Sequence, residues 1–139
     1  LLRVDLRSPT EDYKPLRELG LDQGTLACHR KNRPRLTVIR KSFSPSPLQM
    51  LEAVAQIKHP NIADIFDVYF YDGQLFVVTE YLDASLLDLE FTRLAAAEWE
   101  VATVVTEVIK AMAYLLDTLP NSEIHIDSVR LSLGGDVKL

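Results

Sequence analysis

Metal-binding side chains are few in this sequence, and their positions decide whether a metal site is expected. His29, His59 and His125 are scattered along the chain and lack the short spacing of metal ligands. The single cysteine, Cys28, excludes an internal disulfide framework and any cysteine-rich zinc site. We therefore expect no metal centre.

Basic side chains gather in the first part of the chain, where they indicate a second kind of chemistry, the binding of anions. Residues 1–41 contain ten Lys and Arg against five Asp and Glu, a net charge of +5, whereas residues 42–139 contain five against fifteen, a net charge of −10. The pattern is typical of a solvated hairpin turn with basic flanks, or alternatively of a site for an anion or an acidic partner. The excess is concentrated in Arg30, Lys31, Arg33, Arg35, Arg40 and Lys41.

Length and composition limit the fold and the partners. The 139 residues fit one ordinary domain, and the apolar fraction of 47% with a charged fraction of 25% is typical of a globular protein. The net charge of −5 argues against nucleic acid as a partner. No run approaches the roughly 20 apolar residues that span a bilayer, so we expect no membrane partner. The chain begins with Leu1 instead of Met, which indicates processing or cropping, and without a secretion signal we expect an intracellular, cytoplasmic protein.

Apolar and β-branched runs in the first half predict one antiparallel sheet with a single inserted helix. Ser46 and Pro47 provide the cap and the first residue of this helix, which should end near Lys58. Asp72 and Gly73 form a hairpin signal, because both turn positions favour a positive φ. Five strands are predicted, three before the helix and two after it: Tyr13–Leu19, Thr25–Arg30, Arg35–Arg40, Ile65–Tyr71 and Gln74–Tyr81.

Helical patterns dominate the second half of the chain, which should end in a small hairpin around Gly134-Gly135. A short helix is predicted at Ser85–Leu89 and a long one at Glu98–Asp117. The long helix is so apolar that it needs partners on more than one side. Its main stripe is Val101, Val105, Val108, Met112 and Leu115, and it is widened by Ala102, Ile109, Ala113 and Leu116.

This order of elements resembles a protein kinase. The resemblance rests on "IKHPNI" at Ile57–Ile62, on "LFVVTEYL" at Leu75–Leu82, and on Glu98–Leu116, which looks like the αE helix of the family. It covers about residues 11–139 and ends where the metal-binding Asp-Phe-Gly segment of kinases should begin. It implies an α+β fold with a five-stranded antiparallel sheet, one αC-type helix, and a truncated helical large lobe of αD, αE and a small hairpin. The implied divisions are an N-terminal extension at 1–12, a small lobe at 13–82 and a partial large lobe at 83–139.

The same resemblance implies a degenerate nucleotide site. Gly20 falls at the first position of the family's glycine-rich loop, with Asp22 at the second and Thr25 at the third, while Gly24 is out of register. Arg40 stands where kinases have a lysine, and Met50 stands where they have its glutamate partner. The equivalents of nucleotide-binding residues are Gly20, Gly24, Arg40, Thr79 at the gatekeeper position, and Glu80 and Leu82 in the hinge. We expect no cofactor, with ATP as the alternative ligand.

The segment that matches the catalytic loop departs further from the family. Glu123 stands at the aspartate position, His125 at the lysine and Ser128 at the magnesium-binding asparagine. The resemblance therefore implies no catalytic residues, and it leaves magnesium without protein ligands.

These departures favour a catalytically inactive kinase-like domain, a pseudokinase, that acts as a protein-interaction or regulatory scaffold and resembles decayed fungal kinase-like proteins. The expected contact surface is the apolar face of the long helix at Val101, Val105, Val108 and Met112, which would meet a protein partner or a second copy. The alternatives are an atypical ATP-binding protein kinase, one half of a longer kinase-like protein, or an α+β domain unrelated to kinases.

Overall fold

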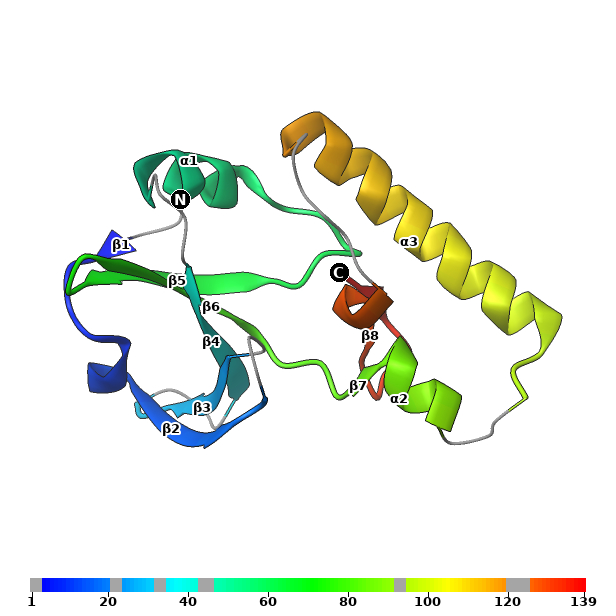
Figure 1. Cartoon of the computed structure of the whole chain (residues 1–139), viewed down its shortest axis with the longest axis horizontal. Coiled ribbons are helices and arrows are strands. Elements are labelled where there is room, and N and C mark those ends of the chain that lie inside the picture. The colour runs from blue at the N-terminus through cyan, green and yellow to red at the C-terminus, as the bar shows by residue number, and fades with distance from the viewer. Residues whose placement is uncertain (1–3, 21–23, 32–34, 43–46, 92–94, 120–125) are drawn as a thin grey trace. The chain divides into compact units, whose positions relative to one another are not determined.

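The computed structural model describes residues 4–20, 24–31, 35–42, 47–91, 95–119 and 126–139. It is an α+β structure, and its chain forms two compact units (Figure 1). The first unit comprises Leu1–Ala55 and Asp64–Tyr81. The second comprises Gln56–Ala63 and Leu82–Leu139, so the chain enters it briefly and then returns to the first unit.

The first unit is a six-stranded sheet with one helix. Its strand order is β1-β5-β6-β4-β3-β2, and every neighbouring pair is antiparallel except β1 with β5. Between β4 and β5 runs the helix α1 (Pro47–Gln56), and a short 3-10 helix, η1 (Pro9–Glu11), precedes β2. The strands are β1 (Val4–Asp5), β2 (Tyr13–Glu18), β3 (Thr25–His29), β4 (Leu36–Ser42), β5 (Ile65–Tyr71) and β6 (Gln74–Glu80).

The prediction of a five-stranded, wholly antiparallel sheet is wrong in one respect. Val4 and Asp5 add a sixth strand, which lies parallel to Val68 and Tyr69 at the edge of the sheet. A strand of two residues shows no alternation in the sequence, so its pairing depends on tertiary contacts alone. The five predicted strands are confirmed, and so is the tight turn between β5 and β6, where Asp72 has φ 52° and Gly73 has φ 70°.

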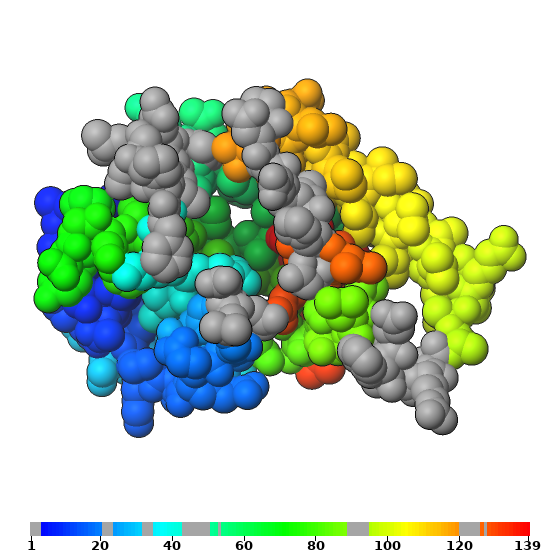
Figure 2. All heavy atoms as spheres, viewed as in Figure 1, coloured from blue at the N-terminus to red at the C-terminus, as the bar shows by residue number. Residues whose placement is uncertain are grey.

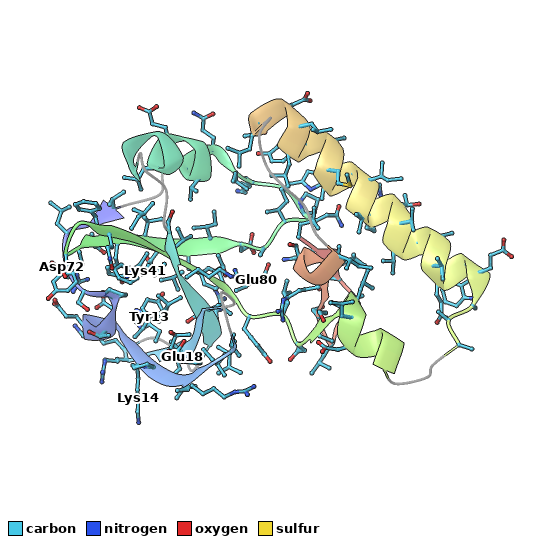
Figure 3. The ribbon with its side chains drawn as sticks, viewed as in Figure 1. Tyr13, Lys14, Glu18, Lys41, Asp72 and Glu80 are labelled. Atoms are coloured by element: carbon cyan, nitrogen blue, oxygen red, sulfur yellow. The ribbon has the colours of Figure 1, made fainter. Side chains whose placement is uncertain are left out.

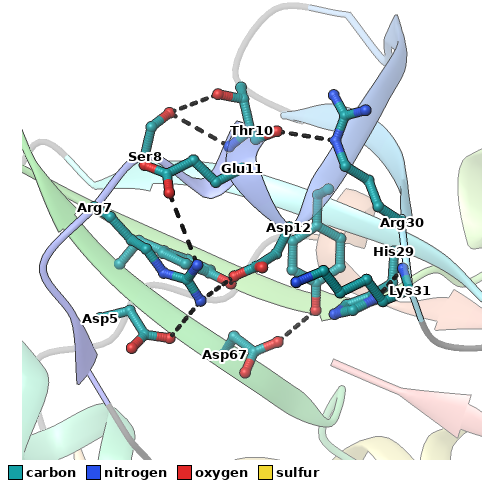
Figure 4. A network of polar contacts seen from close by, with 12 residues as sticks. Asp5, Arg7, Ser8, Thr10, Glu11, Asp12, His29, Arg30, Lys31 and Asp67 are labelled. Atoms are coloured by element: carbon teal, nitrogen blue, oxygen red, sulfur yellow. Dashed lines mark hydrogen bonds and ion pairs between the residues drawn. The ribbon is translucent and has the colours of Figure 1, made fainter.

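The sheet curls, because side chains of β2 and β5 meet although three strands lie between them in the sheet order. The Tyr13 and Tyr69 rings pack edge to face with their centroids 6.3 Å apart. The Tyr13 hydroxyl donates a hydrogen bond to Asp67, and the Tyr69 hydroxyl donates to Asp12 Oδ2 at 2.8 Å (Figure 4). The inner face of the curl encloses one core cluster of Tyr13, Ala27, Ile39, Tyr69 and Val78.

Helix α1 packs through Val54 and Leu51 on the opposite face of the sheet, where Val68 and Leu75 are buried. It ends at Gln56, two residues before the predicted end near Lys58. The reason lies in the second unit, where the Tyr114 hydroxyl donates to the Gln56 carbonyl at 3.1 Å and accepts from the Lys58 N–H at 3.0 Å. The predicted cap residue Ser46 lies outside the described residues.

The second unit is built around the long helix α3 (Glu98–Thr118). A short helix, α2 (Leu86–Phe91), and a 3-10 helix, η2 (Ile126–Ser128), accompany it. The predicted terminal hairpin is confirmed, and it gains a third strand in a sheet of order β7-β8-β9. These strands are β7 (Ala84–Ser85), β8 (Arg130–Leu131) and β9 (Val137–Lys138).

Asn61 connects residues 56–63 to α3 and to β9 through hydrogen bonds. It is 7% exposed, and its amide nitrogen donates to Glu107 Oε2 on α3 at 2.7 Å and to the Val137 carbonyl of β9 at 3.0 Å. Leu139 exchanges backbone hydrogen bonds with Asn61 and Ala63. Residues 56–63 therefore belong with α3 and β9, because their polar groups are satisfied there.

Candidate functional site

Arg40 and Thr79 lie side by side on neighbouring strands of the first unit. Val38 pairs with Thr79 and Arg40 pairs with Val77 in the β4–β6 ladder. This register lets Arg40 Nη1 donate a hydrogen bond to Thr79 Oγ1 at 3.2 Å. Because Thr79 is only 7% exposed, the contact holds the guanidinium against a buried hydroxyl. Kinases have a lysine at the position of Arg40. The planar guanidinium of Arg40 makes a directional contact here, whereas a lysine would bring a compact ammonium.

Gly24 is the loop residue that lies against Arg40. Its φ is +91°, and a Cβ there would lie 2.5 Å from the Ile39 carbonyl oxygen and 3.0 Å from Arg40 Cγ. Only glycine therefore fits at this position. Gly20 also has a positive φ, +117°, but a Cβ there would meet nothing within 4 Å. The two glycines thus differ, since only Gly24 is required by a close approach to β4.

A cavity of about 420 Å³ lies beside the two glycines. Paired residues of neighbouring strands point to the same side of a sheet, so Thr25, Ile39, Lys41 and Phe76 share a face opposite that of Arg40. Thr25 Oγ1 donates to Glu18 Oε1 at 2.8 Å, which holds a carboxylate in the cavity wall. Figure 3 labels Glu18 on β2 and Lys41 on β4. The cavity is lined by Glu18, Gly20, Gly24, Thr25, Ile39, Arg40, Lys41 and Phe76.

The charges that line this cavity are of both signs. Glu18 brings a negative charge into the wall, and negative charges close to phosphate oxygens repel them. Within the described ranges, no group of three His, Cys, Asp or Glu side chains gathers that could hold a metal ion. The charged lining of the cavity is one carboxylate, Glu18, and two cations, Arg40 and Lys41, and Ile39 and Phe76 add apolar surface.

The remaining predicted site residues are distributed over both units. The Glu80 backbone N–H donates to the Asp64 carbonyl at 2.9 Å, and its carboxylate accepts from the Asp64 N–H at 2.8 Å. Leu82 is 5% exposed within the second unit. The structure therefore brings Gly24, Arg40 and Thr79 together in the first unit. Asp22, Glu123 and His125 lie outside the described residues, and Ser128 is exposed in η2.

A polar network near the N-terminus was not predicted from the sequence. Arg7 forms ion pairs with Asp12 at 2.5 Å, with Asp5 at 3.7 Å and with Glu11 at 3.8 Å (Figure 4). Asp12 also accepts the Tyr69 hydroxyl. Burial, reinforced by the hydrogen bond to a carboxylate, raises the pKa of both Tyr13 and Tyr69 above the ordinary value. Both phenols therefore stay protonated and act as donors, which indicates a structural role.

Comparison with known proteins finds sequence similarity to serine/threonine-protein kinases. No protein-family model matches the chain. The chain is 35% identical over 82 residues to the serine/threonine-protein kinase PAK mbt of Drosophila melanogaster, which covers 58% of the chain and 13% of that protein. It is 32% identical over 83 residues to the serine/threonine-protein kinase STE20 of Kluyveromyces lactis, covering 59% of the chain and 8% of the relative. With STE20 of Debaryomyces hansenii the identity is 26% over 141 residues, covering 94% of the chain and 13% of the relative.

These similarities support a kinase-like relationship over a partial stretch. The chain spans only 8% to 13% of the length of these three relatives. Its α+β architecture is compatible with part of a kinase-like fold. Among the described residues, no helix is both long and apolar enough to cross a membrane.

Proposed function

We propose that the chain is a kinase-like domain that lacks phosphotransfer activity and acts by binding another protein through α3. The observation that carries the proposal is an exposed apolar stripe on this helix, made of residues three or four positions apart, which lie on one helix face. Figure 2 shows the atoms of α3, in yellow and orange, at the surface. The exposed fractions are 50% for Val101, 49% for Val105, 59% for Ile109, 38% for Met112 and 61% for Leu116.

A continuous apolar stripe of this kind marks an interaction surface. No charged residue belongs to the stripe between Val101 and Leu116, whereas the exposed side of α3 next to it carries Thr103, Thr106 and Lys110. Val108, which was expected on the contact face, is half-buried, while Ile109 and Leu116 extend that face. Three occupants fit the stripe: a protein partner, a second copy, or the remainder of a longer kinase-like protein.

The expected lack of phosphotransfer is supported by the first unit. Arg40 is engaged with Thr79, and Glu18 places a carboxylate beside the glycine loop. The second candidate function, an atypical ATP-binding kinase, is favoured by the cavity of about 420 Å³ next to Gly20 and Gly24. ATP binding therefore separates the two candidates.

Native mass spectrometry of the purified chain, with and without ATP and Mg²⁺, tests the proposal. We expect a dimer or larger species, or capture of an added partner, with no nucleotide mass. The double variant Val105→Asp/Met112→Asp should abolish the association, whereas Thr103→Asp/Thr106→Asp adds the same charge to the exposed polar side of α3 and should preserve it. A monomer that gains the mass of ATP and Mg²⁺ and phosphorylates a substrate would overturn the proposal in favour of the enzyme.

A further inference from the structure

We propose that the first unit carries a docking surface for an acidic peptide segment of a partner protein. This basic surface consists of Lys14 and Arg17 on β2 together with Arg30, Lys31 and Arg35 at the ends of β3 and β4, all of them exposed. It lies on a different unit from the α3 stripe, and it goes beyond the proposed function. Either surface can therefore fail its test while the other stands.

The strand register places Lys14 and Arg17 on one side of the sheet. Lys14 pairs with Cys28, and Cys28 pairs with Leu36, so these three side chains point to the same side. Arg17, opposite Leu26, lies further along the same side. Figure 3 shows Lys14 extending away from β2.

The β3–β4 hairpin adds charge next to this face. The Arg30 N–H donates to the Asp12 carbonyl at 2.7 Å, which fixes the start of the hairpin beside the start of β2. Figure 4 shows Arg30 and Lys31 close to His29 in this region. Arg35 directly precedes Leu36 of β4, so its side chain leaves the strand on the other side, and its guanidinium carbon lies 4.6 Å from the centroid of the Phe66 ring.

The pairing of these cations supports the proposal. Among the residues that the structure describes, none of the five cations forms an ion pair with a carboxylate. Arg30 Nε donates to the Thr10 carbonyl. Arg7 provides the contrast, because three carboxylates surround it. A cluster of unpaired cations on a protein of net charge −5 produces a local positive potential that attracts carboxylates.

Two features favour an acidic peptide over a longer polyanion. The basic surface covers three strands, which corresponds to about 10 Å between β2 and β4 at the usual strand spacing. A short peptide presents its carboxylates within such a width. A nucleic acid or an anionic membrane presents charge over a larger area, and there the net charge of −10 on residues 42–139 would repel it.

The uncharged residues of β2 and β4 indicate how the peptide binds. Leu16 and Leu36 are 47% and 45% exposed beside the cations, so apolar side chains in the peptide would gain contacts. Pro15 has no N–H to offer an added strand on the open edge of β2. We therefore expect recognition through side chains instead of strand addition.

Fluorescence anisotropy with a labelled peptide of alternating Glu and Leu tests this inference, with the same peptide carrying Gln in place of Glu as its neutral counterpart. The wild-type chain should bind the acidic peptide at least about tenfold more tightly than the neutral one, and the affinity should fall as salt is raised. Lys14→Glu/Arg17→Glu should weaken binding about tenfold or more. The matched control, Lys58→Glu/Lys110→Glu, changes the net charge equally on exposed residues of the second unit and should change affinity less than threefold.

Three results would overturn the proposal. The first is equal binding of the acidic and neutral peptides. The second is an equal loss with the Lys58→Glu/Lys110→Glu control, since that would show a net-charge effect without a site. The third is tighter binding of a single-stranded oligonucleotide, or of vesicles containing phosphatidylserine, than of the acidic peptide. Circular dichroism of both variants checks that the fold is intact. Lys14 and Arg17 form no ion pair among the described residues, and the pair of Lys110 with Glu107 is exposed, so little stability should be lost in either variant.

Discussion

Two sets of large side chains, one in each unit, are placed in opposite ways. The first unit turns tyrosines inward, so that Tyr13 and Tyr69 are 2% and 1% exposed and both donate to carboxylates. The second unit turns apolar side chains outward along α3, where Ala111 is the buried residue of the helix. The first unit thus buries these aromatic side chains within itself, whereas the second leaves an apolar helix face exposed.

This difference indicates that binding surfaces should be sought among side chains that have no partner within the protein. No buried side-chain nitrogen or oxygen in the described ranges lacks a hydrogen-bond partner. The buried polar side chains that the structure describes are therefore satisfied within the protein. Side chains without such contacts lie along the apolar stripe of α3 and at the cations of the basic surface, which are the two surfaces that we propose for partners.

Replacing Gly24 should break the first unit most severely. Gly24→Ala combines a left-handed backbone conformation with a Cβ 2.5 Å from the Ile39 carbonyl oxygen, so we expect a loss of about 3 kcal/mol in the free energy of unfolding. Gly20→Ala, where a Cβ meets nothing within 4 Å, should cost only about 1 kcal/mol. Urea unfolding of both variants measures the difference, and equal losses would show that backbone conformation alone matters.

Asn61 is the corresponding weak point of the second unit. Asn61→Ala removes the donor to Glu107 and Val137, and we expect a loss of about 2 kcal/mol because both acceptors lose a buried partner. Lys110→Ala removes an exposed donor to the same carboxylate and should change the melting temperature little. Amide hydrogen exchange at Leu139 should accelerate in the Asn61 variant alone. Unchanged exchange there would contradict the role of Asn61 in joining β9 to residues 61–63.

The inward tyrosines should make the first unit sensitive to alkaline pH. The pKa of Tyr69 is raised in the folded state, so the neutral phenol stabilises the fold fully below the ordinary tyrosine pKa of about 10. This contribution is lost as the pH rises above that value. Tyr69→Phe should cost about 1 kcal/mol at neutral pH and reduce the alkaline loss. Tyr71→Phe, at an exposed position, should leave the pH profile of wild type, and thermal melts across the alkaline range compare the two.

Replacing Ser85 should give the smallest change in stability, and it tests the hydrogen bonds at the start of α2. Hydrogen bonds from the Ser85 backbone and side chain lower the pKa of Asp88, so ionised Asp88 stabilises the start of α2 above the ordinary carboxyl pKa of about 4. That stabilisation is lost as the pH falls through the folded-state pKa. Ser85→Ala should lower the melting temperature slightly and raise the pKa of Asp88, which NMR titration follows. A carboxyl that titrates as in wild type would exclude the capping contact.

The sequence predicted local features well and long-range features poorly. The turn at Asp72 and Gly73 and the extent of α3 follow from signals within a few residues, and both are confirmed. The short helix was predicted at Ser85–Leu89 and begins one residue later, because Ser85 acts as its cap. Strand β1 has too few residues to show a period. The Tyr13–Asp67 and Tyr69–Asp12 pairs join residues 54 and 57 positions apart, so no local pattern contains them.

The candidate site shows the same division. Motif positions predicted four residues of the site: Gly20, Gly24, Arg40 and Thr79. In the structure Arg40 lies between Gly24 and Thr79 and contacts both. The close approach of Gly24 to β4 depends on the strand register, which the motif positions do not contain. The carboxylate of Glu18 was missed because it belongs to no motif. The hydrogen bond that holds it comes from Thr25 on the facing strand.

The excursion of residues 56–63 into the second unit has a consequence for the order in which the protein folds during synthesis. The Asn61 carbonyl and the Ala63 N–H form their backbone hydrogen bonds with Leu139. These bonds can form only after the following half and more of the chain has been synthesised. The first unit needs nothing beyond Tyr81 and can fold earlier. Late, sequence-distant pairing is slow, and it exposes unpaired backbone in the meantime. The nascent chain should therefore be most open to chaperones and proteases in the interval between the completion of β6 and the arrival of β9.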